Sequence, residues 1–159
     1  MNPLPVDPLV KVSRHVDAIF GAGVSETLPK NLNFEFSRRT GRIKNFSLDG
    51  KLLATLRTDG GLALTIDGAR HFVQNSKQFR QNCVVPVDDA VPFVSEGRSL
   101  FCRHVQWSGQ NVRAGSDVAV LDGDGVIAVG VAVLGSALMN RFSRGVAVKV
   151  REGIKGRTD

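Results

Sequence analysis

The sequence is short of several residue types, and each shortage excludes a class of protein. Its 159 residues include two cysteines and no Cys-x-x-Cys pair, which excludes a disulfide framework and a four-cysteine zinc site. The three histidines lie far apart in the chain and suggest no shared metal or catalytic site. No apolar run approaches the roughly 18 residues of a membrane-spanning helix. We therefore expect a globular protein of one domain or two small ones, with no membrane partner.

The cysteines and the N-terminus indicate the compartment. Cys83 and Cys102 are separated by 18 residues, and we expect two reduced, buried thiols, with a disulfide between them as the alternative. The stretch Met1–Pro5 has no basic region followed by an apolar core, so it does not resemble a signal peptide. Both observations predict a cytoplasmic protein.

Positive charge exceeds negative charge, and the excess lies in the first half. The chain has 21 Lys and Arg against 15 Asp and Glu, a net charge of +6. Residues 1–82 carry 12 basic and 7 acidic groups, whereas residues 83–159 carry 9 and 8. This balance favours a polyanionic partner. Glycine is also abundant, at 17 residues, which predicts many tight turns and short strands.

Residues 1–82 have the pattern of a helix, an antiparallel meander and a second helix. Asp7 and Pro8 are typical of a helix start, and the apolar spacing continues to Phe20. Alternation over 32–36 predicts a half-buried strand, followed by a turn over 37–42. Asp49-Gly50 predicts a hairpin between strands 43–48 and 51–57. A further strand over 62–66 leads to a short helix capped by Asp67.

Residues 83–159 have the pattern of a small barrel. Short strands are predicted over 83–87, 100–105, 117–121, 126–134 and 146–151. Pro86 argues for an edge position of the first of them, and the apolar run 126–134 for a central one. A short helix begins at Asp88 or Asp89 and stops at Gly97, and Ser136 caps another that reaches Phe142. The fold class predicted is α+β, with a helix-and-sheet module over 1–82 and a β barrel over 83–159.

No arrangement of residues suggests catalysis. Asp122 and Asp124 resemble a carboxylate pair, but they flank Gly123 in a hairpin turn, where aspartate bonds to its local backbone. The glycine-rich stretches lack the lysine and the strand–loop–helix context of a phosphate-binding loop. We expect no catalytic residue, no metal site and no cofactor.

Three stretches of the second half carry a specific resemblance. They read DAVPFVSEGRSLFCRHV (Asp89–Val105), VRAGSDVAVLDGDGVIAVGVAVL (Val112–Leu134) and RGVAVKVREGIK (Arg144–Lys155). They resemble the PUA domain, a small RNA-binding pseudobarrel attached to pseudouridine synthases and archaeosine transglycosylases. The stretch Ser37–Ala69 is similar to the module that precedes PUA in archaeosine tRNA-guanine transglycosylases. The resemblance implies a pre-PUA module in 1–82, a PUA domain in 83–159 and an archaeal source.

The resemblance and the charges together predict an RNA-binding face. In PUA domains, RNA runs beside the first helix and the following strand, where a glycine permits close approach of the backbone. Here that residue is Gly97, which also fits a helix C-cap. The expected RNA-binding residues are Gly97, Arg98, Ser99, Arg103, His104, Arg141, Arg144, Lys149, Arg151 and Lys155. Alternation places Lys149 and Arg151 on the strand face opposite Val146, and a merely solvated barrel face is the alternative.

A second basic cluster lies in the first half. Arg38, Arg39, Arg42 and Lys44 are the densest positive charge in the chain and lie in a predicted inter-strand loop. We expect a secondary RNA-binding site there, because guanidinium groups bind phosphates with two hydrogen bonds, or else a solvated surface. Among the aromatic residues, Trp107 is a candidate for base stacking, whereas Phe101 is predicted to lie in the core.

The function predicted is RNA binding without catalysis. By the resemblance, the chain binds tRNA as the anchoring part of a split archaeosine tRNA-guanine transglycosylase, because the catalytic barrel and the cysteine-rich zinc site of that enzyme have no counterpart here. The partners implied are tRNA and a separate catalytic chain. The alternatives are a free-standing RNA-binding factor in ribosome biogenesis or translation, and a protein-interaction module with an incidental basic face.

Overall fold

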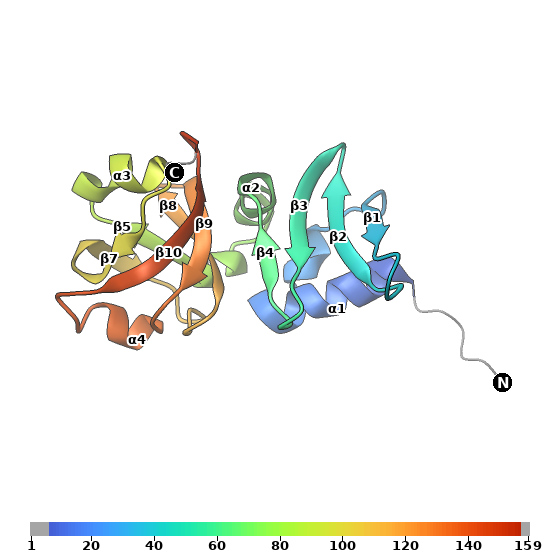
Figure 1. Cartoon of the computed structure of the whole chain (residues 1–159), viewed down its shortest axis with the longest axis horizontal. Helices are drawn as coiled ribbons and strands as arrows, with labels where there is room; N and C mark the ends of the chain where they lie inside the picture. Colours follow the sequence, from blue (N-terminus) through green and yellow to red (C-terminus); the bar gives the residue numbers. More distant parts are fainter. Residues whose placement is uncertain (1–6, 157–159) are drawn as a thin grey trace.

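The computed structural model describes residues 7–156, which form two β-sheets placed side by side with helix α2 between them (Figure 1). The prediction that Met1–Pro5 does not resemble a signal peptide concerns residues outside the described range. Within the described part of the chain, no helix has the length and apolar character needed to cross a membrane.

The first sheet and its helices contain the N-terminal half. Its elements are α1 (Pro8–Phe20), η1 (Val24–Thr27), β1 (Asn33–Phe36), β2 (Ile43–Leu48), β3 (Lys51–Leu56), β4 (Leu62–Leu64), α2 (Ile66–Asn75) and η2 (Gln78–Asn82). The strands pair antiparallel in the order β1-β2-β3-β4. The Asp7 carboxylate accepts a hydrogen bond from the Leu9 N–H at 2.8 Å and so begins α1. Asp49 and Gly50 have positive φ in the β2–β3 turn. The predicted helix, meander and helix are confirmed.

The second sheet forms a nearly closed pseudobarrel. Its elements are β5 (Cys83–Pro86), η3 (Asp88–Ala90), α3 (Val91–Ser95), β6 (Leu100–Phe101), η4 (Cys102–His104), β7 (Val105–Ser108), β8 (Asp117–Asp122), β9 (Gly125–Ala132), α4 (Ser136–Met139) and β10 (Val146–Gly153). The strand order is β6-β10-β9-β8-β5-β7, and β5 and β8 are the parallel pair. The predicted α+β class and the central position of β9 are confirmed.

Two predicted helix starts are wrong. Thr65, not Asp67, caps α2, because the Thr65 hydroxyl accepts a hydrogen bond from the Gly68 N–H at 2.9 Å. Ile66 therefore belongs to the helix and not to the preceding strand. The side chains of Asp88 and Asp89 make no capping hydrogen bond, since both residues already lie inside η3.

The start and the length of α4 also differ from the prediction. Gly135 is its N-cap, and the Ser136 hydroxyl instead hydrogen-bonds with the Ser108 hydroxyl at 2.6 Å. The helix ends at Met139, so Phe142 lies outside it. The hydroxyl of Ser136 therefore ties α4 to β7 in place of capping the helix.

Pro86 does not mark an edge strand. β5 lies between β8 and β7, but its pairing with β8 involves only Cys83 and Val84. Pro86 is the last residue of β5, beyond that pairing, so its missing N–H costs no hydrogen bond to β8. A proline at the C-terminal end of β5 is therefore compatible with an internal position of this strand.

The predicted strand over 100–105 is broken. The chain passes from β6 to β7 through the η4 turn, and these two strands are the opposite edges of the sheet. The break is what brings the two edges near each other and nearly closes the barrel. It places Arg103 and His104 on a turn and not on a strand.

The apolar core is continuous across the two sheets. One cluster of buried side chains joins Phe20, Phe72 and Phe79 of the first half to Leu121 and Val129 of the second. The three phenylalanine rings contact one another with centroids 5.0 to 5.8 Å apart. A second cluster fills the barrel. Because this boundary removes large apolar surfaces from water, the halves pack as one body.

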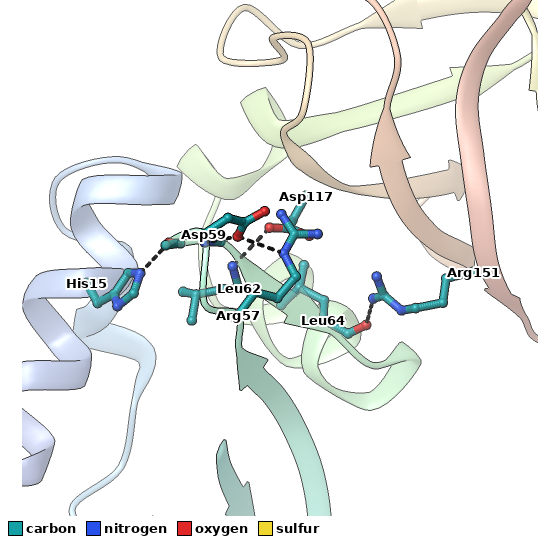
Figure 2. Close-up of polar contacts among 9 residues, drawn as sticks. His15, Arg57, Asp59, Leu62, Leu64, Asp117 and Arg151 are labelled. Atoms are coloured by element: carbon teal, nitrogen blue, oxygen red, sulfur yellow. Dashed lines mark hydrogen bonds and ion pairs between the residues drawn. The ribbon is translucent and has the colours of Figure 1, made fainter. Parts of the chain in front are cut away.

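Polar contacts reinforce the same boundary. β4 is an edge strand of the first sheet, and its outward backbone groups bond to barrel side chains. The Leu62 N–H donates to the Asp117 carboxylate at 2.9 Å, and the Arg151 guanidinium donates to the Leu64 carbonyl. Arg57 forms an ion pair with Asp117 at 3.1 Å. Figure 2 shows these five residues, which we call the junction.

Asp117 is buried, with 3% of its surface exposed. Burial raises the pKa of Asp117, while Arg57 and the Leu62 N–H act in the opposite direction. A buried carboxylate of this kind depends on its partners, because water no longer solvates it.

Both cysteines are reduced and buried, as predicted. Burial raises the pKa of Cys83 to about 12. The thiol of Cys83 therefore remains protonated and acts as a small apolar side chain in the core.

Arg57→Met tests the junction. The substitution removes the ion pair of the buried Asp117 carboxylate and leaves it with the Leu62 N–H and the more distant Arg151, and we expect unfolding in urea to show a loss of about 2 kcal/mol. Because burial already raises the pKa of Asp117, protonation relieves the unpaired charge, and the loss should be smaller near pH 5 than near pH 8. Arg70→Met is the control, since its pair with Asp67 is exposed and 3.9 Å long. Equal losses in both variants would contradict the assignment.

Candidate nucleic-acid interface

The predicted site begins at the corner between α3 and β6. Gly97 has φ +99°, a backbone conformation that favours glycine, and its N–H donates to the Val94 carbonyl at 3.0 Å. The Arg98 N–H donates to the Phe93 carbonyl at 3.1 Å, and the Arg98 guanidinium lies over the Phe93 ring, 5.8 Å from its centroid. Phe93 is 53% exposed. The corner therefore presents a cation and an aromatic ring together.

Phe101 continues this surface along β6. The prediction that Phe101 lies in the core is wrong, because its side chain is 45% exposed. β6 is an edge strand, and Leu100 is the residue of the pair that faces the core. Trp107 lies on the opposite edge strand, β7, half-buried beneath Arg80. Of these two aromatic side chains, Phe101 is therefore the more exposed to solvent.

The loop before β10 completes the surface. Arg141, Phe142 and Arg144 are exposed, and the Cys102 N–H donates to the Gly145 carbonyl at 2.9 Å, which ties this loop to η4. The exposed Arg103 lies on the same turn. We call the exposed side chains of this surface the β6 edge face: Phe93, Arg98, Phe101, Arg103, Arg141, Phe142, Arg144, Lys149 and Lys155. Cations and aromatic rings thus occur together on elements of the barrel that pair or hydrogen-bond with one another.

Lys149 and Lys155 join the face from β10. Lys149 is exposed opposite Val131 of β9, and the Lys155 N–H donates to the Ser95 carbonyl at 2.8 Å, which holds it beside the end of α3. Gly97, Ser99 and His104 are partly buried. The sequence analysis identified the cations of this face but not Phe93 and Phe142. Phe93 lies in a helix, as predicted, but on its exposed side, whereas Phe142 lies outside the helix predicted for it.

Arg151 is not the exposed residue that strand alternation predicts. It is partly buried, and its guanidinium donates to the Leu64 carbonyl in the junction. The register of β10 against β9 shifts between Val150 and Glu152, so the simple alternation fails there. Arg151 joins the two halves of the chain and does not extend into solvent.

The second basic cluster is exposed, as its loop position predicts. Arg38, Arg39, Arg42 and Lys44 lie at or beside the loop between β1 and β2. Glu35 is 3.8 Å from Lys44, a weak exposed pair. The loop lies in the first half of the chain, away from the barrel that carries the β6 edge face.

Asp122 and Asp124 lie where the hairpin prediction puts them, exposed at the β8–β9 turn. Asp124 is 3.5 Å from Arg80. Among residues 7–156, no three His, Cys, Asp or Glu side chains gather in a way that suits a metal ion.

Family comparisons agree with this geometry. Residues 83–154 match the model of the PUA domain, and residues 11–78 match the model of the patch-forming domain C2 of tRNA-guanine transglycosylase. The chain carries a C2 patch-forming domain followed by a PUA domain. The β6 edge face lies on the PUA domain, and the Arg38 cluster lies on the C2 domain.

Similar curated proteins are tRNA-guanine(15) transglycosylases of archaea. The protein of Methanobrevibacter smithii is 35% identical over 94% of this chain, and that of Thermococcus kodakarensis is 36% identical over 86%. In both comparisons this chain spans 23% of the relative's length.

Solved structures share the fold over nearly the whole chain. A hypothetical protein of Pyrococcus horikoshii OT3 superposes with a TM-score of 0.71 and 19% identity, covering 96% of this chain and 93% of that one. A PUA-domain protein of Aeropyrum pernix K1 superposes with a TM-score of 0.66 and 16% identity, covering 96% and 85%. These likenesses support the fold of the C2 and PUA domains together.

Lys149→Glu and Arg151→Glu should differ in stability. Lys149 is exposed, so its substitution should change the free energy of unfolding by less than about 0.5 kcal/mol. Arg151→Glu removes the donor to the Leu64 carbonyl and places a carboxylate near Asp117, so we expect a loss of about 2 kcal/mol in urea unfolding. Unchanged stability of Arg151→Glu would show that this arginine is not part of the junction.

Proposed function

We propose that this protein binds tRNA through the β6 edge face and has no catalytic activity of its own. The observation that carries the proposal is the exposure of cations and phenylalanine rings on neighbouring elements of the PUA domain, around the corner where Gly97 turns the chain with φ +99°. Cations attract phosphates, and aromatic rings stack on unpaired bases. The bound RNA is then recognised by its backbone and shape, with few contacts to base edges.

The relatives support tRNA as the partner. Their names describe transglycosylases that act on tRNA, and this chain matches less than a quarter of their length. We propose that it anchors tRNA for a separate catalytic chain in the cytoplasm, with residues 1–82 and 83–159 as its two modules. The proposed RNA-binding residues are Gly97, Arg98, Ser99, Arg103, His104, Arg141, Arg144, Lys149 and Lys155, with Arg38, Arg39, Arg42 and Lys44 as a second site. Arg151 is assigned to the junction.

A free-standing RNA-binding factor is the second candidate. The Pyrococcus horikoshii structure supports this candidate, because this chain covers 93% of that chain, so the two have the same two-domain extent. Purification from native cells separates the two candidates. A zinc-containing catalytic chain should copurify if the protein is a transglycosylase anchor, and its absence from a complex that still holds RNA would favour the free-standing factor.

Charge reversal on the β6 edge face should weaken tRNA binding. The double variant Arg144→Glu, Lys149→Glu should lower affinity for tRNA at least tenfold at moderate salt. It should also flatten the salt dependence, because each lost phosphate contact lowers the slope of log affinity against log salt concentration by about 0.9 for duplex DNA and by a similar order for RNA. Lys77→Glu, at an exposed lysine of the C2 domain, is the matched control. Filter binding at several salt concentrations measures both quantities. Wild-type affinity and slope in the double variant would refute the proposal for this face.

The purified chain alone should not exchange guanine in tRNA. Among the described residues of the β6 edge face, no nucleophilic side chain lies beside a general base. The enzyme relatives are also about four times longer than this chain. Incorporation of labelled guanine into tRNA is the assay, with heat-denatured protein as the control. Incorporation above that control by the chain alone would overturn the noncatalytic assignment.

A further inference from the structure

A basic groove lies between α1 and the β1–β2 loop of the C2 domain. It has a volume of about 1510 Å³, and residues of the β3–β4 turn form part of its lining. The His15 ring nitrogen hydrogen-bonds with the Gly60 carbonyl at 2.7 Å, so this turn is held against α1. Val12, Ile43 and Leu56 contribute apolar surface to its lining. The groove therefore has fixed walls and a partly apolar interior.

The three arginines of the β1–β2 loop stand on a backbone that is closed by its own hydrogen bonds. The Ser37 N–H donates to the Arg42 carbonyl at 2.7 Å, and the Gly41 N–H donates to the Ser37 carbonyl at 2.8 Å. Gly41 has φ +72°, which permits the tight turn. The Ser37 hydroxyl also accepts from the Thr40 N–H at 3.3 Å. Because the loop is closed by its own hydrogen bonds, its arginines need little backbone ordering when they bind a ligand.

The charge of the groove suits phosphate. Its described lining includes six cationic residues and one carboxylate, that of Glu35. The cations are Lys11, Arg38, Arg39, Arg42, Lys44 and Arg57, of which Arg57 is already paired with Asp117 and Asp59. Glu35 is occupied by Lys44 and by the Asn45 amide, which donates to it at 2.9 Å. Arg38, Arg39 and Arg42 make no ion pair with any residue in the described range 7–156, so their guanidinium groups remain available to an anion.

Phe36 adds an aromatic surface that the fold does not use. Alternation along β1 predicts that Phe36 faces the core with Leu32 and Phe34, but Phe36 is 48% exposed and lines the groove. The cause is a shift in the β1–β2 register between Glu35 and Phe36. Because Phe36 is exposed and lines the groove together with the arginines, its ring is accessible to a ligand bound there.

We propose that this groove binds an unpaired nucleotide of the RNA held by the protein, with the base against the Phe36 ring and the flanking phosphates on Arg38, Arg39 and Arg42. This inference rests on the proposed RNA-binding function. A paired base cannot present its face to Phe36, because its neighbours in the helix cover it. The aromatic ring therefore selects an unpaired nucleotide, whereas cations alone would accept any phosphate backbone.

The test compares two RNA hairpins of identical stem, one fully paired and one with a three-nucleotide bulge. The whole chain should bind the bulged hairpin at least about fivefold more tightly than the paired one. This ratio corresponds to the low end of the affinity gained from one stacked base. Phe36→Ala should remove this preference and leave affinity for the paired hairpin nearly unchanged, while Phe36→Tyr, which keeps the ring, should retain it. Leu52→Ala is the matched control, because Leu52 is also exposed and apolar on this domain.

A second measurement tests the phosphate contacts. Changing Arg38, Arg39 and Arg42 together to alanine should reduce the salt slope for the bulged hairpin by about 0.7 for each lost single-strand contact. The same triple variant should retain its thermal stability, since all three side chains are exposed.

The outcomes separate this inference from the proposed function. Suppose that the wild type binds both hairpins with strong salt dependence. If Phe36→Ala then keeps the preference for the bulge, or if the triple variant keeps the wild-type slope, the groove assignment is wrong and the RNA-binding function remains. If the wild type binds neither hairpin, nor tRNA, both are wrong. Tight binding of adenosine monophosphate alone, lost in Phe36→Ala, would reassign the groove to a free nucleotide and overturn the inference.

Discussion

The buried carboxylate of Asp117 is the constraint on which the arrangement of the two domains depends. It lies at the start of β8 and accepts the outward N–H of β4, while Arg151 from β10 donates to the next outward carbonyl of that strand. Side chains of the PUA domain thus bond to two of the outward backbone groups on this edge of the C2 sheet. Since the polar partners must align and the apolar core continues beneath them, the two domains have one packed arrangement and not a flexible connection.

A fixed arrangement has a consequence for RNA recognition. The β6 edge face and the Arg38 cluster lie on different domains, yet the junction holds them in one body. Two cationic surfaces at a fixed separation select RNA whose phosphates have a matching separation, and each surface raises the effective concentration of RNA at the other. Shape selection of this kind suits a folded RNA and requires little contact with base edges.

Local patterns in the sequence predicted most elements but few of the contacts between them. Asp7-Pro8 and Asp49-Gly50 succeeded because caps and tight turns depend on neighbouring residues. Strand order depends on pairing between distant segments, so the internal position of β5 and the break after Phe101 were not predicted. The cations of the site were visible as charge, whereas the exposure of Phe101 and the burial of Arg151 follow from an edge strand and a domain boundary, which no local pattern encodes.

Ultraviolet crosslinking of the whole chain to tRNA, followed by mass spectrometry of the crosslinked peptides, tests the central claim most directly. The account predicts crosslinks at Phe93, Phe101 or Phe142 of the β6 edge face and at Phe36 of the C2 groove, on the same RNA, because the junction presents both surfaces together. Crosslinks confined to other surfaces, such as the exposed sides of α2 and η2, would contradict it.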